Sequence, residues 1–215
     1  MTFGWILADH NGNIITQGYG HTNGRPSSLR SEAAGMLAVS IFLGMIQKWT
    51  NFHFEQIPIT MYADNKSLIT RQNEHLQYEA TYPNSTLAPE YDLTEEIYCT
   101  HRKYNIEATF CHVKGHQDDD QDIDDLTLPA RLNVYADRLA SRFYKEGSPS
   151  NPRVLMSPSH RAHLLIQGVS ITNDYNYQLL RAHTEPHYIH YLQDKFGWDI
   201  TTELEIHWKG LRNGL

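Results

Sequence analysis

Hydrophobic and polar positions alternate between strand-like and helix-like spacing over the first two thirds of the chain. Two short apolar runs, residues 3–7 and 13–19, flank a turn at residues 9–12, where an Asn-Gly pair can supply positive φ angles, so a hairpin is expected. Apolar residues then recur at helical spacing over residues 29–48, and one of the two serines before them can cap that helix.

The alternation continues beyond this helix. The expected elements are a strand at 57–62, a polar helix from about residue 66, a loop at 80–89, a helix at 91–103, a strand at 106–113 and a helix at 128–144. Pro129 fits the first turn of the last helix, where a missing N–H costs nothing. This order of strands and helices predicts an α/β fold with a mixed sheet.

The last third of the chain has a different pattern. Gly, Ser, Pro and Asn dominate residues 147–152, which predicts a linker at 147–156 between a domain at 1–146 and a small extension at 157–215. Within the extension we expect a small hairpin at 164–171 around Gln167-Gly168. Two or three short helices, ending near Gly197 and Gly210, should make the rest mainly helical.

The net charge of -7 argues against nucleic-acid binding that depends on simple electrostatic attraction. Six acids lie between residues 118 and 125, and outside this run 18 basic residues face 19 acidic ones. Such a run is typical of a solvated loop. It lacks the Gly and terminal Glu of a calcium loop.

Composition otherwise indicates an ordinary globular protein, 40% hydrophobic and 20% charged. Two cysteines, Cys99 and Cys111, make no disulfide framework, which favours a reducing compartment and an intracellular location in cytoplasm or nucleus. We expect no membrane contact, because no apolar run looks long enough to span a bilayer and the N-terminus has no signal pattern.

Three acids lie where separate elements begin or end: Glu32 early in a helix, Asp64 after a strand, and Asp137 on the helix after the last strand. Singly they have ordinary explanations, which are a charge near a helix N-terminus, a helix cap and a solvated face. His116 by itself would be a loop histidine. Together, at one edge of a sheet, such carboxylates suit hard divalent cations such as Mg²⁺.

The chain resembles the type 1 ribonuclease H family over residues 3–144, especially the domains of reverse transcriptases and retroelements. The matching stretches are Gly4-Trp5-Ile6-Leu7, residues 28–34, Tyr62-Ala63-Asp64-Asn65, residues 113–118 with Val-Lys-Gly-His, and residues 132–140 with Tyr-Ala-Asp-Arg.

This resemblance implies a ribonuclease H-like sheet with flanking helices that cuts the RNA strand of an RNA–DNA hybrid with two metal ions. Glu32, Asp64 and Asp137 would hold Mg²⁺ or Mn²⁺, and His116 would assist water attack or product departure. Hybrid recognition would rest on shape and 2′-hydroxyls. An upstream polymerase segment fits the family, while the oligomeric state is left open.

The departure from the family is at the front of the chain. The family's first, central strand carries a further catalytic Asp, and Asp9 is better explained as a turn residue. We therefore expect that strand to be missing and activity to be impaired. The alternative is a catalytically dead nucleic-acid-binding or degenerate retroelement-derived domain. A zinc site of Cys99, Cys111, His112 and His116 is disfavoured, because no close Cys pair exists.

Overall fold

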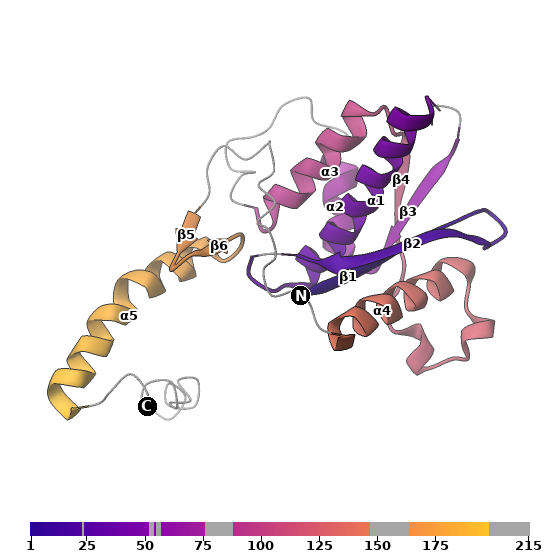
Figure 1. The fold of residues 1–215 in the computed structure, drawn as a ribbon. Helices are drawn as coiled ribbons and strands as arrows, with labels where there is room; N and C mark the ends of the chain where they lie inside the picture. The colour runs from indigo at the N-terminus through magenta and orange to yellow at the C-terminus, as the bar shows by residue number, and fades with distance from the viewer. Residues whose placement is uncertain (23, 52–53, 55–56, 76–87, 147–163, 198–215) are drawn as a thin grey trace. The chain divides into compact units, whose positions relative to one another are not determined.

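The structure of the chain, a computed structural model, describes all residues except 23, 52–53, 55–56, 76–87, 147–163 and 198–215 (Figure 1). By compactness it divides into two units, Met1–Asn173 and Asp174–Leu215. The linker expected at 147–156 lies outside the described residues, so the expected domain boundaries stay predictions.

An antiparallel hairpin opens the fold, formed by β1 (Thr2–Ala8) and β2 (Ile14–His21). Its turn is held by Asp9, whose Oδ1 accepts hydrogen bonds from the backbone N–H groups of Asn11 and Asn13, each at 2.9 Å. Of the expected Asn-Gly pair only Gly12 has a positive φ, at 88°. Asp9 is thus a turn residue, as expected.

β1 is packed between two helices, α1 (Ser28–Thr50) and α4 (Leu128–Glu146). Trp5 faces α1, where its ring lies 5.4 Å from that of Phe42. Gly4 faces α4 so closely that a Cβ there would lie 2.2 Å from the backbone oxygen of Ala136. Because successive residues of a strand point to opposite faces, α1 and α4 cover opposite faces of β1.

A second sheet pairs β3 (Ile59–Ala63) with β4 (Ala108–His112) in parallel. Two helices accompany it, α2 (Lys66–His75) and α3 (Tyr91–Lys103). This parallel pair is the crossover arrangement that the alternation of strands and helices predicts.

The mixed α/β class is therefore confirmed, but the sheet differs from the expectation. β1–β2 and β3–β4 are separate two-stranded sheets rather than one. In the described part of the chain, β1 and β3 each have one edge that no strand pairs. That a central strand is missing between them remains a prediction.

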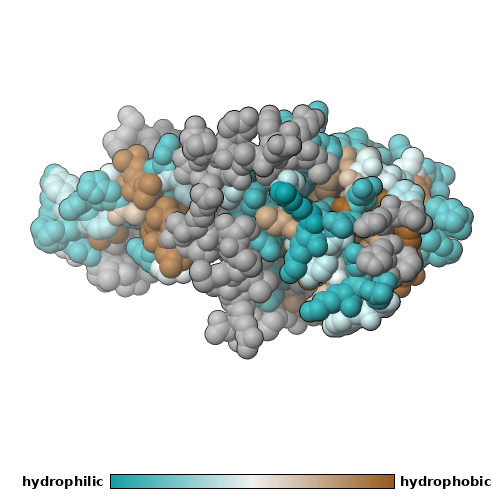
Figure 2. Space-filling view, turned by 90° about the horizontal axis from the view of Figure 1, so that it is seen from above, coloured by the Kyte–Doolittle hydropathy of each residue, from teal (hydrophilic) through white to brown (hydrophobic). Residues whose placement is uncertain are grey.

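Two groups of buried side chains make the core. The larger lies between α1, α2, α3 and the β3–β4 sheet, and its most enclosed members include Ala33, Leu68 and Ile97. The smaller joins Val113, after β4, to Leu126 and the inner face of α4. On the face seen in Figure 2, hydrophobic residues lie between stretches of hydrophilic ones.

A buried ion cluster joins the N-terminal ends of α1 and α3. Arg30 donates to Glu90 at 2.8 Å and bidentately to Asp92 at 2.9 and 2.8 Å. Asn173 also donates to Glu90, at 2.6 Å, directly after the small hairpin of β5 (Leu164–Ile166) and β6 (Val169–Ile171). The hairpin around Gln167-Gly168 is confirmed, with φ angles of 51° and 79° at its turn.

In the part of the second unit that the structure describes, one long helix, α5 (Tyr175–Phe196), ends at Gly197 with φ 68°. The expectation of two or three short helices is wrong over these residues, because α5 continues through Pro186. A helix end near Gly210 lies outside the described residues.

α1 corrects a further expectation. By length and composition it is the one helix among the described residues that could cross a membrane. It nevertheless carries the buried, ion-paired Arg30 and the buried Ser40, and it packs against β1 and α3. These contacts are those of a core helix, which passes the same test of length and composition.

Candidate acidic site

Glu32 lies on the second turn of α1, on the side that faces β1 and α4. Burial, and then the negative charges of Asp64 and Asp137, raise its pKa to about 8. A carboxylate that stabilised the helix N-terminus would instead have a lowered pKa. Glu32 is therefore not explained as a helix charge, and its nearest charged influences are other acids.

Asp64 follows directly after β3, where two contacts fix the backbone. Val113 N–H donates to the Ala63 oxygen at 3.0 Å, continuing the parallel ladder, and His112 Nε2 lies 3.0 Å from the Asp64 oxygen. A Cβ at Gly115 would lie 2.5 Å from Asp64 Oδ2, so a larger residue there would displace this carboxylate.

The cap of α2 is supplied by Asn65 and not by Asp64. Asn65 Oδ1 accepts a hydrogen bond from the Leu68 N–H at 3.1 Å. This arrangement leaves the Asp64 carboxylate available for the acidic site, so the capping explanation for Asp64 is excluded.

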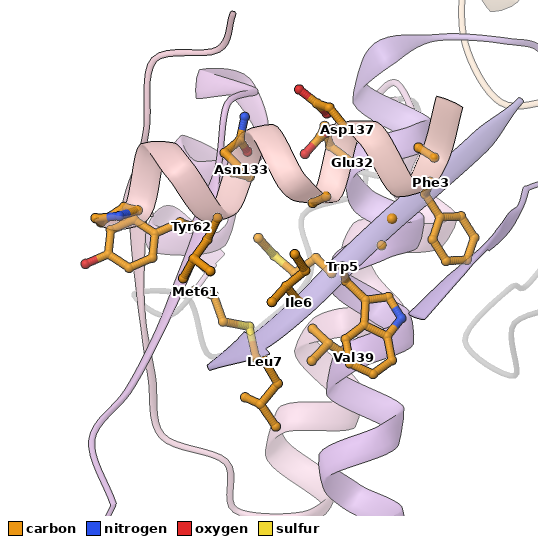
Figure 3. A pocket seen from close by; sticks show the side chains of 18 of the residues that line it. Phe3, Trp5, Ile6, Leu7, Glu32, Val39, Met61, Tyr62, Asn133 and Asp137 are labelled. Atoms are coloured by element: carbon orange, nitrogen blue, oxygen red, sulfur yellow. The ribbon is translucent and has the colours of Figure 1, made fainter. Parts of the chain in front are cut away.

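Asp137 reaches the same place from the middle of α4. Its pKa is raised to about 6 by burial first and then by Asp64, while His116 lowers it and Asp118 raises it. Three acids from α1, β3 and α4 therefore interact through their charges. Figure 3 shows Glu32 and Asp137 side by side. That Glu32, Asp64 and Asp137 form one site stays a prediction, which their mutual charge effects support.

His116 lies in the loop between β4 and α4, in the left-handed conformation with φ 52°. It is exposed and begins a short 3-10 turn, η3 (Gln117–Asp119); a second, η4 (Ile123–Asp125), follows. Asp118, within the run expected to be a solvated loop, influences Asp137 and pairs with Arg138 at 3.5 Å. Sequence reasoning missed this contact, which only the fold brings about.

Glu32 and Asp137 line one end of a cleft of about 990 Å³ between β1 and β3 (Figure 3), and Asp64 follows Ala63, the last residue of β3 on its lining. Side chains of α1 and α4 form its other walls. Asn133, on the α4 wall, has a buried Nδ2 with no hydrogen-bond partner among the described residues. No sequence signal distinguished Asn133 from the other polar residues of this helix.

Metal-ligand geometry is incomplete. The described residues include no group of three or more His, Cys, Asp or Glu side chains placed to hold one ion. Neither the three acids nor the set of Cys99, Cys111, His112 and His116 forms such a group. Cys99 and Cys111 are free thiols.

The fold and site thus define a mixed α/β domain with an acidic cluster at the end of a cleft. Among solved structures the chain is similar to LC11-RNase H1, isolated from compost by a metagenomic approach, with a TM-score of 0.43 and 13% sequence identity. The match covers 67% of this chain and 93% of that one. No family model and no curated protein sequence matches the chain.

Proposed function

We propose that the chain is a ribonuclease H-type endonuclease domain, directed at the RNA strand of RNA–DNA hybrids and impaired as it stands. The observation that carries this proposal is the convergence of Glu32, Asp64 and Asp137 from three elements, in the order and local sequence of that family. The likeness to LC11-RNase H1 concerns the fold alone and adds nothing to the activity.

The chemistry of the donors suits Mg²⁺ or Mn²⁺, because these ions prefer carboxylate oxygens. When bound, such ions would polarise the phosphodiester and lower the pKa of a water. Glu32, Asp64 and Asp137 would hold them, and burial together with the neighbouring acids raises the pKa values of Glu32 and Asp137. The three side chains do not form a ready ligand set, which is why we propose impairment.

The protein's own groups have distinct tasks in this proposal. Val113 and His112 contact the carbonyl oxygens of Ala63 and Asp64, which fixes the backbone around Asp64. Gly115 lets the loop pass close to the Asp64 carboxylate. His116, exposed beside Asp137, would assist the attacking water or the departing product with a proton. The hybrid would be recognised mainly by its shape and 2′-hydroxyls, since base edges carry little of this recognition.

A second function is favoured by one observation, the absence of a complete metal-ligand group among the described residues. A catalytically dead, retroelement-derived domain would bind the hybrid without cutting it. It would share the fold, the intracellular setting and the substrate of the enzyme.

Two measurements separate these functions. The first is isothermal titration of Mn²⁺ into the 215-residue chain and into Asp64→Asn, where we expect weak binding that the substitution abolishes. The second is binding and cleavage of an end-labelled RNA–DNA hybrid with Mg²⁺, where we expect slow cleavage that Glu32→Gln removes.

The matched control is Asp119→Asn, which removes an exposed acid of the neighbouring loop and should change neither result. Hybrid binding without any cleavage would support the dead domain. If neither metal nor hybrid binds, both functions are wrong.

A further inference from the structure

We propose that the cleft between β1 and β3 is an acceptor for a β-strand supplied by another polypeptide, which would join the two sheets into one. This inference concerns a binding surface and does not depend on nuclease activity. It is carried by the way the cleft is lined.

The cleft opens on the edges of its two strands and not on their faces. Every residue of β1 (Thr2–Ala8) and of β3 (Ile59–Ala63) lines it. A cavity lying over the face of a strand would contact alternate residues, because successive side chains point to opposite sides. Consecutive lining therefore places the cavity beside the backbone of both strands.

The backbones of β1 and β3 each have one edge whose N–H and C=O groups bond to no other described strand. β1 is bonded to β2 along one edge only, and β3 to β4 along one edge only. An edge strand presents a row of unpaired N–H and C=O groups and is a template for a further strand. An extended peptide in the cleft can bond to both rows at once, which a compact ligand cannot do.

The direction of an added strand follows from the ends of its neighbours. Ser31, next to Glu32, donates to the Thr2 oxygen at the start of β1, whereas Asp64 follows the end of β3. β1 thus begins, and β3 ends, at the acidic end of the cleft. A strand parallel to β3 and antiparallel to β1 would repeat the two pairings already present in these sheets, and its carboxyl end would face the acids.

The walls formed by α1 and α4 determine which side chains the added strand should carry. On one side Met36 and Val39 of α1 line the cleft, and on the other Leu132 and Ala136 of α4 do so. A strand covered by helices on both faces reads as a continuous apolar run. About five such residues match the length of β3.

No described strand of this chain or of a second copy is free to be the occupant, because each already has a partner. Each of the six described strands is already hydrogen-bonded to a neighbour, and β5 and β6 have only three residues each. A second copy would have to break such a pair before it could enter between α1 and α4. An isolated extended segment of another polypeptide has no pairing to lose.

The test uses a fluorescein-labelled peptide, Lys-Thr-Val-Ile-Val-Val-Asn-Gly, titrated with the 215-residue chain in the absence of metal and nucleic acid. Its control has the same side chains with alternate backbone amides N-methylated, which removes donors for one edge. We expect saturable binding of the first peptide and about tenfold weaker binding of the second, as the loss of hydrogen bonds to an edge strand requires.

Two protein variants locate the peptide. Ile6→Lys places a charge in the cleft and should weaken binding about tenfold, whereas Ile15→Lys changes an exposed residue of β2 outside the cleft and should leave it unchanged. Hydrogen exchange should slow in β1 and β3 when the peptide is added, with no change in α5.

Three results would overturn the proposal. They are no saturable binding up to a chain concentration of about 100 μM, equal binding of the N-methylated peptide, and a dimer of the chain whose protection of β1 and β3 disappears on dilution. The last result would assign the cleft to a second copy. Because metal and hybrid are absent throughout, failure here leaves the nuclease proposal to its own test.

Discussion

Glu32 shows at the scale of one residue how a site can oppose the stability of its own fold. Its pKa is raised from 4.5 to about 8, mainly by burial. Between these two values the unfolded chain has released the proton while the folded chain keeps it. The free energy of unfolding therefore falls as pH rises from about 4.5 to about 8. Above about pH 8 Glu32 is ionised in both states, and the fall is complete.

Glu32→Gln should consequently stabilise the chain at alkaline pH. The amide cannot ionise, so at pH 8.5 we expect the free energy of unfolding to rise by roughly 2–4 kcal/mol, a range reduced for solvent screening. Below about pH 4.5 the two proteins should differ little. Urea unfolding at both pH values checks this, with the exposed Glu107→Gln as control. Equal stability of Glu32→Gln and wild type at pH 8.5 would contradict the buried, proton-retaining environment.

Arg30, unlike Glu32, is a buried charge with partners of opposite sign, so its loss should lower the free energy of unfolding. Its guanidinium is buried and satisfies Glu90 and Asp92 with three hydrogen bonds. Arg30→Met would leave two buried carboxylates without their cation, and we expect a loss of about 3–5 kcal/mol in the free energy of unfolding. Arg138→Met, which breaks an exposed pair with Asp118, should cost less than about 1 kcal/mol. Similar losses in both variants would remove the special role of the buried cluster.

At the scale of elements, α2 depends on a residue that sequence reasoning passed over. Asn65 caps the helix, and it also donates to the Ser28 hydroxyl at 3.4 Å. Asn65→Ala should lower the free energy of unfolding by about 1 kcal/mol, whereas Asn65→Asp retains a capping oxygen and should cost less. Thermal unfolding of the two variants compares them. An equal loss in both would show that the cap is not the important contact.

The positions of most elements could be predicted because their causes are local. Helical spacing of apolar residues located α1, α3 and α4, and the two hairpins followed from turn residues. The same dependence on local rules made the prediction for α5 wrong. A proline is expected to end a helix, but α5 continues through Pro186. Which residue caps α2 depended on the geometry after β3, which spacing alone does not specify.

The candidate site was predictable only in part. Element ends located the three acids, and in the fold their charges act on one another. The approach of Asp118 to Asp137 depends on the path of the loop after β4, and the buried amide of Asn133 on how α4 lies against β1. Both are tertiary contacts with no periodic signal in the sequence. The catalytic roles of Glu32, Asp64, Asp137 and His116 stay predictions.

At the scale of the whole molecule, the strand acceptor and the nuclease proposal make a joint prediction. The same peptide with Asp in place of its penultimate Asn would bring a fourth carboxylate to the acidic end of the cleft. With saturating peptide and Mg²⁺ we expect hybrid cleavage to rise at least about tenfold over the Asn peptide, or roughly 1.4 kcal/mol of barrier. Single-turnover cleavage assays measure this. Equal rates with both peptides bound would separate the two proposals and leave only the docking surface.

The position of Trp5 gives the cleft an optical reporter of its own. Its indole lies on β1 at the cleft and packs at a tilt against the ring of Phe42, whereas Trp49 is 77% exposed. An indole that leaves water emits at shorter wavelength and is shielded from soluble quenchers. Filling the cleft should therefore shift the Trp5 emission to shorter wavelength and reduce its quenching by iodide. Comparison with Trp5→Phe separates this signal from the emission of Trp49, Trp198 and Trp208. Occupancy of the cleft could then be followed in the unlabelled protein, by its intrinsic fluorescence alone.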